Sequence, residues 1–198
     1  MSATIIVYPP SGGGNHLKNL LCLDKSFANS SDLNLEPYET KNREVHSTPG
    51  RNMTLERANA AKECTGNFIL HGHFGELAPF RSIINDIQHK KYVIITIDSD
   101  RDRRLLDSRQ HRLGQFSHEY YLHEEQYFLY QPAMYSTYFS GPVSEIFSFP
   151  LTDLWNPVIN YNKTWDHLNN FLGTQIDLDQ AQNLHTQWRA NNSLTEYF

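Results

Sequence analysis

Three groups of polar residues in this chain could do chemistry, and each directly follows a short apolar run. The groups and the runs before them are residues 11–15 after 4–8, residues 71–73 after 68–70, and residues 98–101 after 92–97. The first group is rich in glycine, the second holds two histidines, and the third begins with two carboxylates around a serine. Glycine N–H groups bind anions, histidine transfers protons near neutral pH, and carboxylates bind divalent cations. The sequence therefore predicts a site for an anionic ligand with acid–base or metal chemistry beside it.

The glycine-rich group comprises Ser11, Gly12, Gly13, Gly14 and Asn15. A helical spacing of leucines begins at residue 17, so the order is strand, tight loop, helix. Such a loop can aim several backbone N–H groups and the positive end of the helix at a phosphate or a sulfate. It lacks the Gly-Lys-Ser/Thr ending that an ATP-binding loop needs. The alternative is a strand-to-helix turn that simply requires glycine.

The two histidines of the second group, His71 and His73, stand at the end of a short strand. A zinc site needs further ligands at a regular spacing, and the sequence offers none. A histidine at a strand end beside an anion loop can act as a general base. The alternative is a histidine whose ring nitrogens are satisfied by loop carbonyls. Both interpretations stay open from the sequence.

The third group starts with Asp98, Ser99 and Asp100. Two carboxylates at this spacing could hold a divalent cation, as in a metal-dependent transferase or hydrolase that uses a nucleotide. Ser99 or Asp100 could instead cap the helix that follows, where acidic residues suit the helix dipole, and we favour this second interpretation. Arg101 could bind a phosphate with its planar guanidinium or lie on a solvated helix face.

The elements that position these residues are strands and helices, which alternate along the chain. Strands are expected at residues 4–8, 68–70, 92–97 and 146–149, and helices at 54–64, 79–88, 101–113, 117–130, 164–172 and 179–189. This alternation predicts a parallel α/β sheet of about four to five strands with helices on both faces. Ligands of such sheets bind at the carboxyl ends of the strands. The three polar groups should therefore meet at one edge.

The length, composition and charge of the chain limit which classes of protein it can belong to. A length of 198 residues favours one domain over residues 1–198, and 39% hydrophobic residues indicate a globular chain. The net charge of -5 argues against nonspecific binding to nucleic acid. No apolar run has membrane-spanning length and no secretory signal is visible, so we expect no membrane partner and a cytoplasmic location. Cys22 and Cys64 are expected to be reduced thiols.

The order of these motifs resembles that of the cytosolic-type sulfotransferases. Those enzymes open with a strand, Tyr-Pro-Lys-Ser-Gly-Thr-Thr-Trp and a helix, then carry a catalytic histidine after a second strand and close with a strand and helix. The segments of this chain that carry the resemblance are residues 7–21, 68–79, 92–108 and 149–173. The resemblance implies a three-layer P-loop-type sheet flanked by helices. Short, divergent members occur in bacteria and their viruses, so a viral member would lie in the host cytoplasm.

The same resemblance implies a reaction: transfer of a sulfuryl group from 3′-phosphoadenosine 5′-phosphosulfate to a hydroxyl or amine of a small-molecule or glycan acceptor, without a metal. The 5′-phosphosulfate would lie on the glycine-rich group, and His73 would be the base. The 3′-phosphate would be held by Arg101 and Ser108, and Lys18 or His16 would replace the loop lysine of the family. The acceptor would lie under residues 24–53 and 120–138.

This chain departs from the family pattern at several positions. Pro10 stands where the family has its loop lysine, and Gly13 and Gly14 replace two threonines. Asp100 stands where the family has an arginine, with Arg101 one position further on. These departures leave a second alternative open, a protein of the same fold without catalysis that serves in binding or assembly. The oligomeric state is not predicted.

Overall fold

A four-stranded parallel sheet forms the centre of the molecule. The computed structural model describes residues 2–9, 12–32, 53–112, 130–134, 145–158 and 163–191. The strands β1 (Ser2–Val7), β2 (Asn67–Gly72), β3 (His89–Thr96) and β4 (Ile146–Pro150) are ordered β2-β1-β3-β4 across the sheet. Every neighbouring pair is parallel. The expected α/β architecture and the adjacency of the first three strands are therefore confirmed.

The central position of β1 decides where a ligand could enter. β1 pairs with β2 on one side and β3 on the other, with Val7 level with Gly72 and Ile94. The chain thus leaves β1 toward one edge of the sheet and later returns past it to the other. In open parallel sheets, the crevice for ligands lies at such a reversal, beyond the carboxyl ends of the strands.

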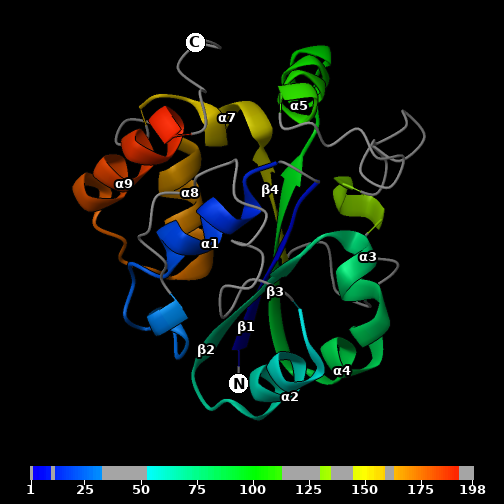
Figure 1. Cartoon of the computed structure of the whole chain (residues 1–198). Helices are drawn as coiled ribbons and strands as arrows, with labels where there is room; N and C mark the ends of the chain where they lie inside the picture. The colour runs from blue at the N-terminus through cyan, green and yellow to red at the C-terminus, as the bar shows by residue number, and fades with distance from the viewer. Residues whose placement is uncertain are drawn as a thin grey trace.

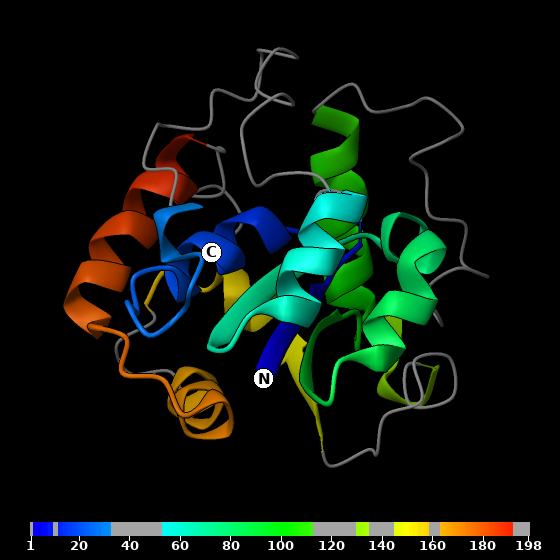
Figure 2. The same cartoon turned by 90° about the horizontal axis from the view of Figure 1, so that it is seen from below.

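Helices cover both faces of the sheet (Figures 1 and 2). On one side lie α1 (Gly14–Leu21), α8 (Lys163–Leu172) and α9 (Leu178–Asn191). On the other lie α2 (Leu55–Glu63), α3 (Phe74–Leu77) and α4 (Arg81–Asp86). β1 from Ala3 to Val7 and β3 from Tyr92 to Thr96 are buried on both faces, which explains the apolar sequence of these central segments. Two helices lie at the carboxyl end, α5 (Asp100–Arg112) after β3 and α7 (Leu151–Trp155) after β4 (Figure 1).

Several local signals in the sequence act as expected. The Thr54 hydroxyl accepts the N–H of Arg57 and caps α2, and Gly173 ends α8 at a φ of 72°. The expected helix over 79–88 is instead the 3-10 turn η3 (Ala78–Phe80) followed by α4. Helix α2 ends at Glu63, one residue before the end of the expected range 54–64. The expected helix over 117–130 lies almost wholly outside the described residues.

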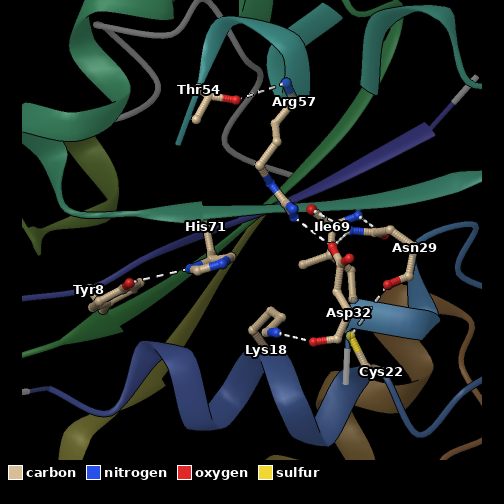
Figure 3. Close-up of polar contacts among 9 residues, drawn as sticks. All are labelled: Tyr8, Lys18, Cys22, Asn29, Asp32, Thr54, Arg57, Ile69 and His71. Atoms are coloured by element: carbon tan, nitrogen blue, oxygen red, sulfur yellow. Dashed lines mark hydrogen bonds and ion pairs between the residues drawn. The ribbon is translucent and has the colours of Figure 1, made fainter. Parts of the chain in front are cut away.

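The outer edge of β2 is paired with a side chain instead of another strand. Asn29 Oδ1 accepts the N–H of Ile69, and Asn29 Nδ2 donates to the Ile69 carbonyl, both at 2.9 Å (Figure 3). Further along, the N–H of Ala28 donates to the Asn67 carbonyl at 2.7 Å. The segment before the 3-10 turn η1 (Ser30–Asp32) therefore satisfies part of this edge.

Neither cysteine of the chain is in a disulfide: Cys22 is buried and Cys64 half-buried. Burial raises the pKa of the Cys22 thiol to about 11. Among the helices that the structure describes, none combines the length and the apolar character that crossing a membrane requires.

Candidate functional site

The three polar groups come together at the carboxyl edge of the sheet because they follow three adjacent strands. The glycine turn follows β1, His73 follows β2, and Asp98 lies two residues beyond β3. Ser11 and Pro10 lie outside the described residues.

Packing explains each described glycine of the turn. The N–H of Gly12 donates to the Pro9 carbonyl at 2.8 Å, and a side chain on Gly12 would meet the Pro9 ring at 2.8 Å. Gly13 has a φ of 88°, which favours glycine. A Cβ on Gly14 would lie 1.8 Å from the Tyr8 ring. The turn therefore needs glycine for folding, whatever its amides bind.

Tyr8 contacts the glycine turn and both histidines. Its hydroxyl donates to Asn15 Oδ1 at 3.3 Å and lies 3.3 Å from His71 Nδ1 (Figure 3). Its ring lies against Gly14 and meets the His73 ring edge-on, with centroids 4.6 Å apart. Tyr8 thus connects the glycine turn to both histidines, a role that its place at the end of an apolar run does not signal.

His73 is held in one orientation and one tautomer. Its Nδ1 lies 2.9 Å from the Tyr8 carbonyl oxygen, which can only accept, so Nδ1 carries the proton. In the neutral ring, Nε2 is then the basic nitrogen. The backbone N–H of His73 donates to Glu76 Oε2 at 2.8 Å, which fixes the residue at the start of α3. The side chain is half-buried at the same edge as the glycine turn and does not point into the core.

His71, by contrast, is 2% exposed, and its ring stacks with that of Tyr8 at a centroid distance of 6.2 Å. Its Nδ1 is engaged with the Tyr8 hydroxyl. The structure therefore gives the two histidines different surroundings: His71 is buried, and His73 is half-buried.

Lys18, the predicted substitute for the family lysine, contacts a different part of the molecule. It is buried, and its Nζ donates to the Asp32 carbonyl at 2.6 Å (Figure 3). The Asp32 carboxylate in turn accepts from Arg57 on α2 at 2.8 Å. Lys18 thereby ties α1 to η1.

His16, predicted to contact the ligand, is paired with a residue from the other end of the chain. Its Nε2 lies 2.9 Å from Nδ1 of His185 on α9, and its ring stacks on Trp188 with centroids 4.0 Å apart and planes 2° apart. A Cβ on Gly13 would lie 3.2 Å from the Trp188 ring and from Leu154. Side chains from α7 and α9 therefore pack directly against the glycine turn.

At the end of β3, the capping interpretation is confirmed. The Ser99 hydroxyl accepts the N–H of Asp102 at 3.1 Å, and Asp102 Oδ2 accepts the N–H of Ser99 at 3.0 Å. Asp98 accepts the Thr96 hydroxyl at 2.6 Å, and exposed Asp100 lies 3.8 Å from Arg103. This reciprocal pair of bonds is a capping box. Its sequence signal is the serine three residues before an acidic residue, Ser99 before Asp102.

Asp102 is the carboxylate that sequence reasoning missed. It is 1% exposed, and its second oxygen, Oδ1, accepts the N–H of Thr152 at the start of α7. The residue thus joins the β3–α5 connection to the β4–α7 connection. Within the described ranges, no cluster of three or more His, Cys, Asp or Glu side chains could hold a metal ion.

Arg101 and Ser108, the predicted contacts of the 3′-phosphate, both lie on α5 at the same edge. They are seven residues apart, so they share one face of the helix two turns apart. Arg101 is exposed and Ser108 half-buried. The structure brings them to the edge beyond β3, one strand away from the glycine turn.

Comparison with known protein families, with curated proteins and with solved structures finds no match to this chain.

Proposed function

We propose that this chain transfers a sulfuryl group from 3′-phosphoadenosine 5′-phosphosulfate to a hydroxyl or amine acceptor, with His73 as the general base. The observation that carries the base assignment is the hydrogen bond from His73 Nδ1 to the Tyr8 carbonyl. This bond points Nε2 away from the Tyr8 carbonyl. It also keeps the ring in the tautomer whose Nε2 can accept a proton. The sequence resemblance supplies the identity of the donor.

The position of His73 supports the same proposal. It lies at the carboxyl edge where parallel sheets bind ligands, and the Tyr8 ring contacts both it and the glycine turn. In the proposed step, the acceptor oxygen attacks the sulfur while Nε2 takes its proton, and the bond between sulfur and the bridging oxygen breaks. The products are the sulfated acceptor and 3′,5′-adenosine bisphosphate. The Tyr8 carbonyl stabilises the imidazolium that forms.

A second candidate is a protein of the same fold that binds without catalysis. The observation in its favour is Lys18, whose ammonium contacts the Asp32 carbonyl while Pro10 occupies the position of the family lysine. Without a cation at the bridging oxygen, the leaving group would lack its usual charge stabilisation. The metal-dependent alternative, which rests on Asp98 and Asp100, gains no such support, because Asp98 accepts from the Thr96 hydroxyl and Asp100 lies exposed beside Arg103.

The test measures binding and transfer separately. Calorimetry with 3′,5′-adenosine bisphosphate in the presence of a chelator reports the donor site. Transfer of labelled sulfate to a phenol, a sugar and an amine reports catalysis. We expect His73→Ala to lower transfer by about 10²- to 10⁴-fold. Its affinity for the bisphosphate should stay within about twofold, because a base acts on the acceptor.

The matched control is His89→Ala, an exposed histidine at the opposite end of the sheet, which should leave both measurements unchanged. Binding without transfer in the parent protein would favour the second candidate. Absence of both bisphosphate binding and transfer would contradict the proposed reaction and leave the second candidate in its place. Equal transfer by the parent and His73→Ala would remove His73 from the mechanism.

A further inference from the structure

Helix α9 covers the glycine turn with an aromatic side chain. Trp188 is 6% exposed, its ring lies 3.2 Å from the position of a Cβ on Gly13, and its face stacks on His16. Figures 1 and 2 show α9 running alongside α1, the helix that the turn starts. A group that approaches Gly13 from the side on which a Cβ would lie meets the indole ring.

A chain of hydrogen bonds holds α9 in this position. His185 Nε2 lies 2.6 Å from the Asn156 carbonyl oxygen, so Nε2 must donate. In the neutral ring, Nδ1 is then an acceptor, and it lies 2.9 Å from His16 Nε2, which must donate in turn. The two imidazoles therefore join the residue after α7 to α9 and then to α1, and the two bonds define which nitrogen of His185 carries the proton.

We propose that the His16–His185 pair is a proton-operated latch on α9: neutral, it keeps Trp188 over the glycine turn, and doubly protonated, it releases the helix and uncovers the turn. The inference rests on the proposed function only in taking the turn as the place where the anionic ligand binds. The latch itself is defined by α1, α9 and the Asn156 carbonyl.

Proton accounting explains why the second proton opens the latch. The first proton can sit on His16 Nδ1, which leaves the bond from His16 Nε2 to His185 Nδ1 intact. The second proton must go to His185 Nδ1, because Nε2 already carries one. Two N–H groups then face each other across 2.9 Å on two positive rings, and the bond is lost.

The surroundings of the pair favour the neutral, closed form. Burial lowers the pKa of His185 to about 4, the hydrogen bond to the Asn156 carbonyl acts against this shift, and Arg189 on the same helix adds to it. The charged side chains on the neighbouring helices bind elsewhere: Lys18 on α1 donates to the Asp32 carbonyl, and Asp153 on α7 accepts from Thr164. Release is therefore expected as the pH falls from 6.5 toward 4.

The test follows Trp188 itself. Tryptophan emission is recorded from pH 8 to pH 4 for the parent and for Trp188→Phe, and the difference isolates Trp188 from Trp155 and Trp165. We expect its emission to shift to the red below pH 6.5 while the far-UV circular dichroism of the sheet persists. His185→Gln, which can still donate to the Asn156 carbonyl and accept from His16, should abolish the shift.

The control is His167→Gln on the exposed face of α8, which should leave the shift in place. A shift of equal size in His185→Gln, no shift in the parent, or a shift that coincides with loss of the sheet would each overturn the latch. Should His185→Gln fail to fold, ¹⁵N NMR of the parent tests the same chain. Protonated Nε2 and unprotonated Nδ1 on His185 support it, and the opposite tautomer contradicts it.

A binding experiment separates this inference from the proposed function. The affinity for 3′,5′-adenosine bisphosphate is measured at pH 7.5 and pH 5 for the parent and His185→Gln, so that titration of the phosphates cancels. We expect about a tenfold gain at low pH in the parent relative to the variant. A normal red shift with no binding at either pH keeps the latch and rejects the ligand. A red shift with pH-independent binding rejects the covering role of Trp188.

Discussion

The carboxyl edge of the sheet has two halves that use polar groups differently. Beyond β1 and β2, contacts run through rings: Tyr8 meets His71, His73 and the glycine turn, and Trp188 meets His16. Beyond β3 and β4, they run through one buried carboxylate, Asp102, which accepts three backbone N–H groups and a hydroxyl. From the sequence, capping is already the favoured role of the group at residues 98–100, whereas both interpretations of the histidines stay open.

The two halves differ in which of their polar atoms are already used within the protein. Both oxygens of Asp102 are used within the protein, so that half of the edge has its acceptors assigned to structure. His73 uses Nδ1 and its backbone N–H to fix its position, and this leaves Nε2 for an incoming group. Counting donors and acceptors atom by atom therefore distinguishes the halves, whereas residue type does not.

The largest loss of stability should come from adding a methyl group next to the Tyr8 ring, in the half of the edge beyond β1 and β2. Gly14→Ala places a methyl group 1.8 Å from the Tyr8 ring. We expect the free energy of unfolding to fall by about 4 kcal/mol, roughly 3 from overpacking and about 1 from displacing the Tyr8 hydroxyl from its partners. Urea denaturation followed by circular dichroism measures it.

Gly75→Ala is the matched control, because nothing lies within 4 Å of the added methyl group. It should leave stability unchanged or raise it by up to about 1 kcal/mol. Equal losses in the two variants would mean that the Tyr8 ring does not close on the turn.

A slightly smaller loss of stability should appear when His185, in the same half of the edge, is protonated. The folded pKa of His185 is about 4 against an ordinary 6.5, so the unfolded chain binds the extra proton between these values. Stability is therefore full above pH 6.5, falls as the pH drops to about 4, and loses nothing more from this group below that. At about 1.4 kcal/mol for each pH unit, the loss is about 3 kcal/mol.

Chemical denaturation across this pH range should show a shallower slope for His185→Gln than for the parent. His167→Gln, on an exposed surface, should reproduce the parent slope. Parallel curves for the parent and His185→Gln would show that the His16–His185 pair does not govern the acid response.

Substitutions in the half of the edge beyond β3 and β4 should lower the free energy of unfolding least. Asp102→Ala removes the acceptor for three backbone N–H groups, but Asp98 and Ser99 are exposed and water can replace part of the loss. We expect a loss of about 2 kcal/mol in unfolding free energy. Asp100→Ala removes only an exposed pair at 3.8 Å and should cost about 0.5 kcal/mol or less. If Asp100→Ala proved the more damaging of the two, Asp102 would not be the joint between α5 and α7.

The fold was predictable where the sequence has long apolar runs or strong caps. The strand that ends at Thr96 is apolar on both faces, and Thr54 and Gly173 mark helix ends by local chemistry alone. Helices α3 and α7 were not predicted, because four or five residues carry too little periodicity and tertiary contacts hold such short helices in place.

The site was less predictable, because its decisive contacts are distant in sequence. His73 could be singled out by its place after a strand, but its tautomer depends on the Tyr8 carbonyl, 65 residues away. His16 and His185 are 169 residues apart, and nothing in either neighbourhood signals the other. Lys18 looked available next to the glycine turn, and only the structure reveals its bond to the Asp32 carbonyl.

The side chain of Asn29 has a consequence for how copies of this protein behave together. A sheet edge with open N–H and C=O groups is a template on which another molecule can add a strand and begin a fibre. By bonding both backbone groups of Ile69, the Asn29 amide occupies that template on β2. One amide group thus helps keep crowded copies from joining their sheets, a benefit to the population of molecules rather than to any single fold.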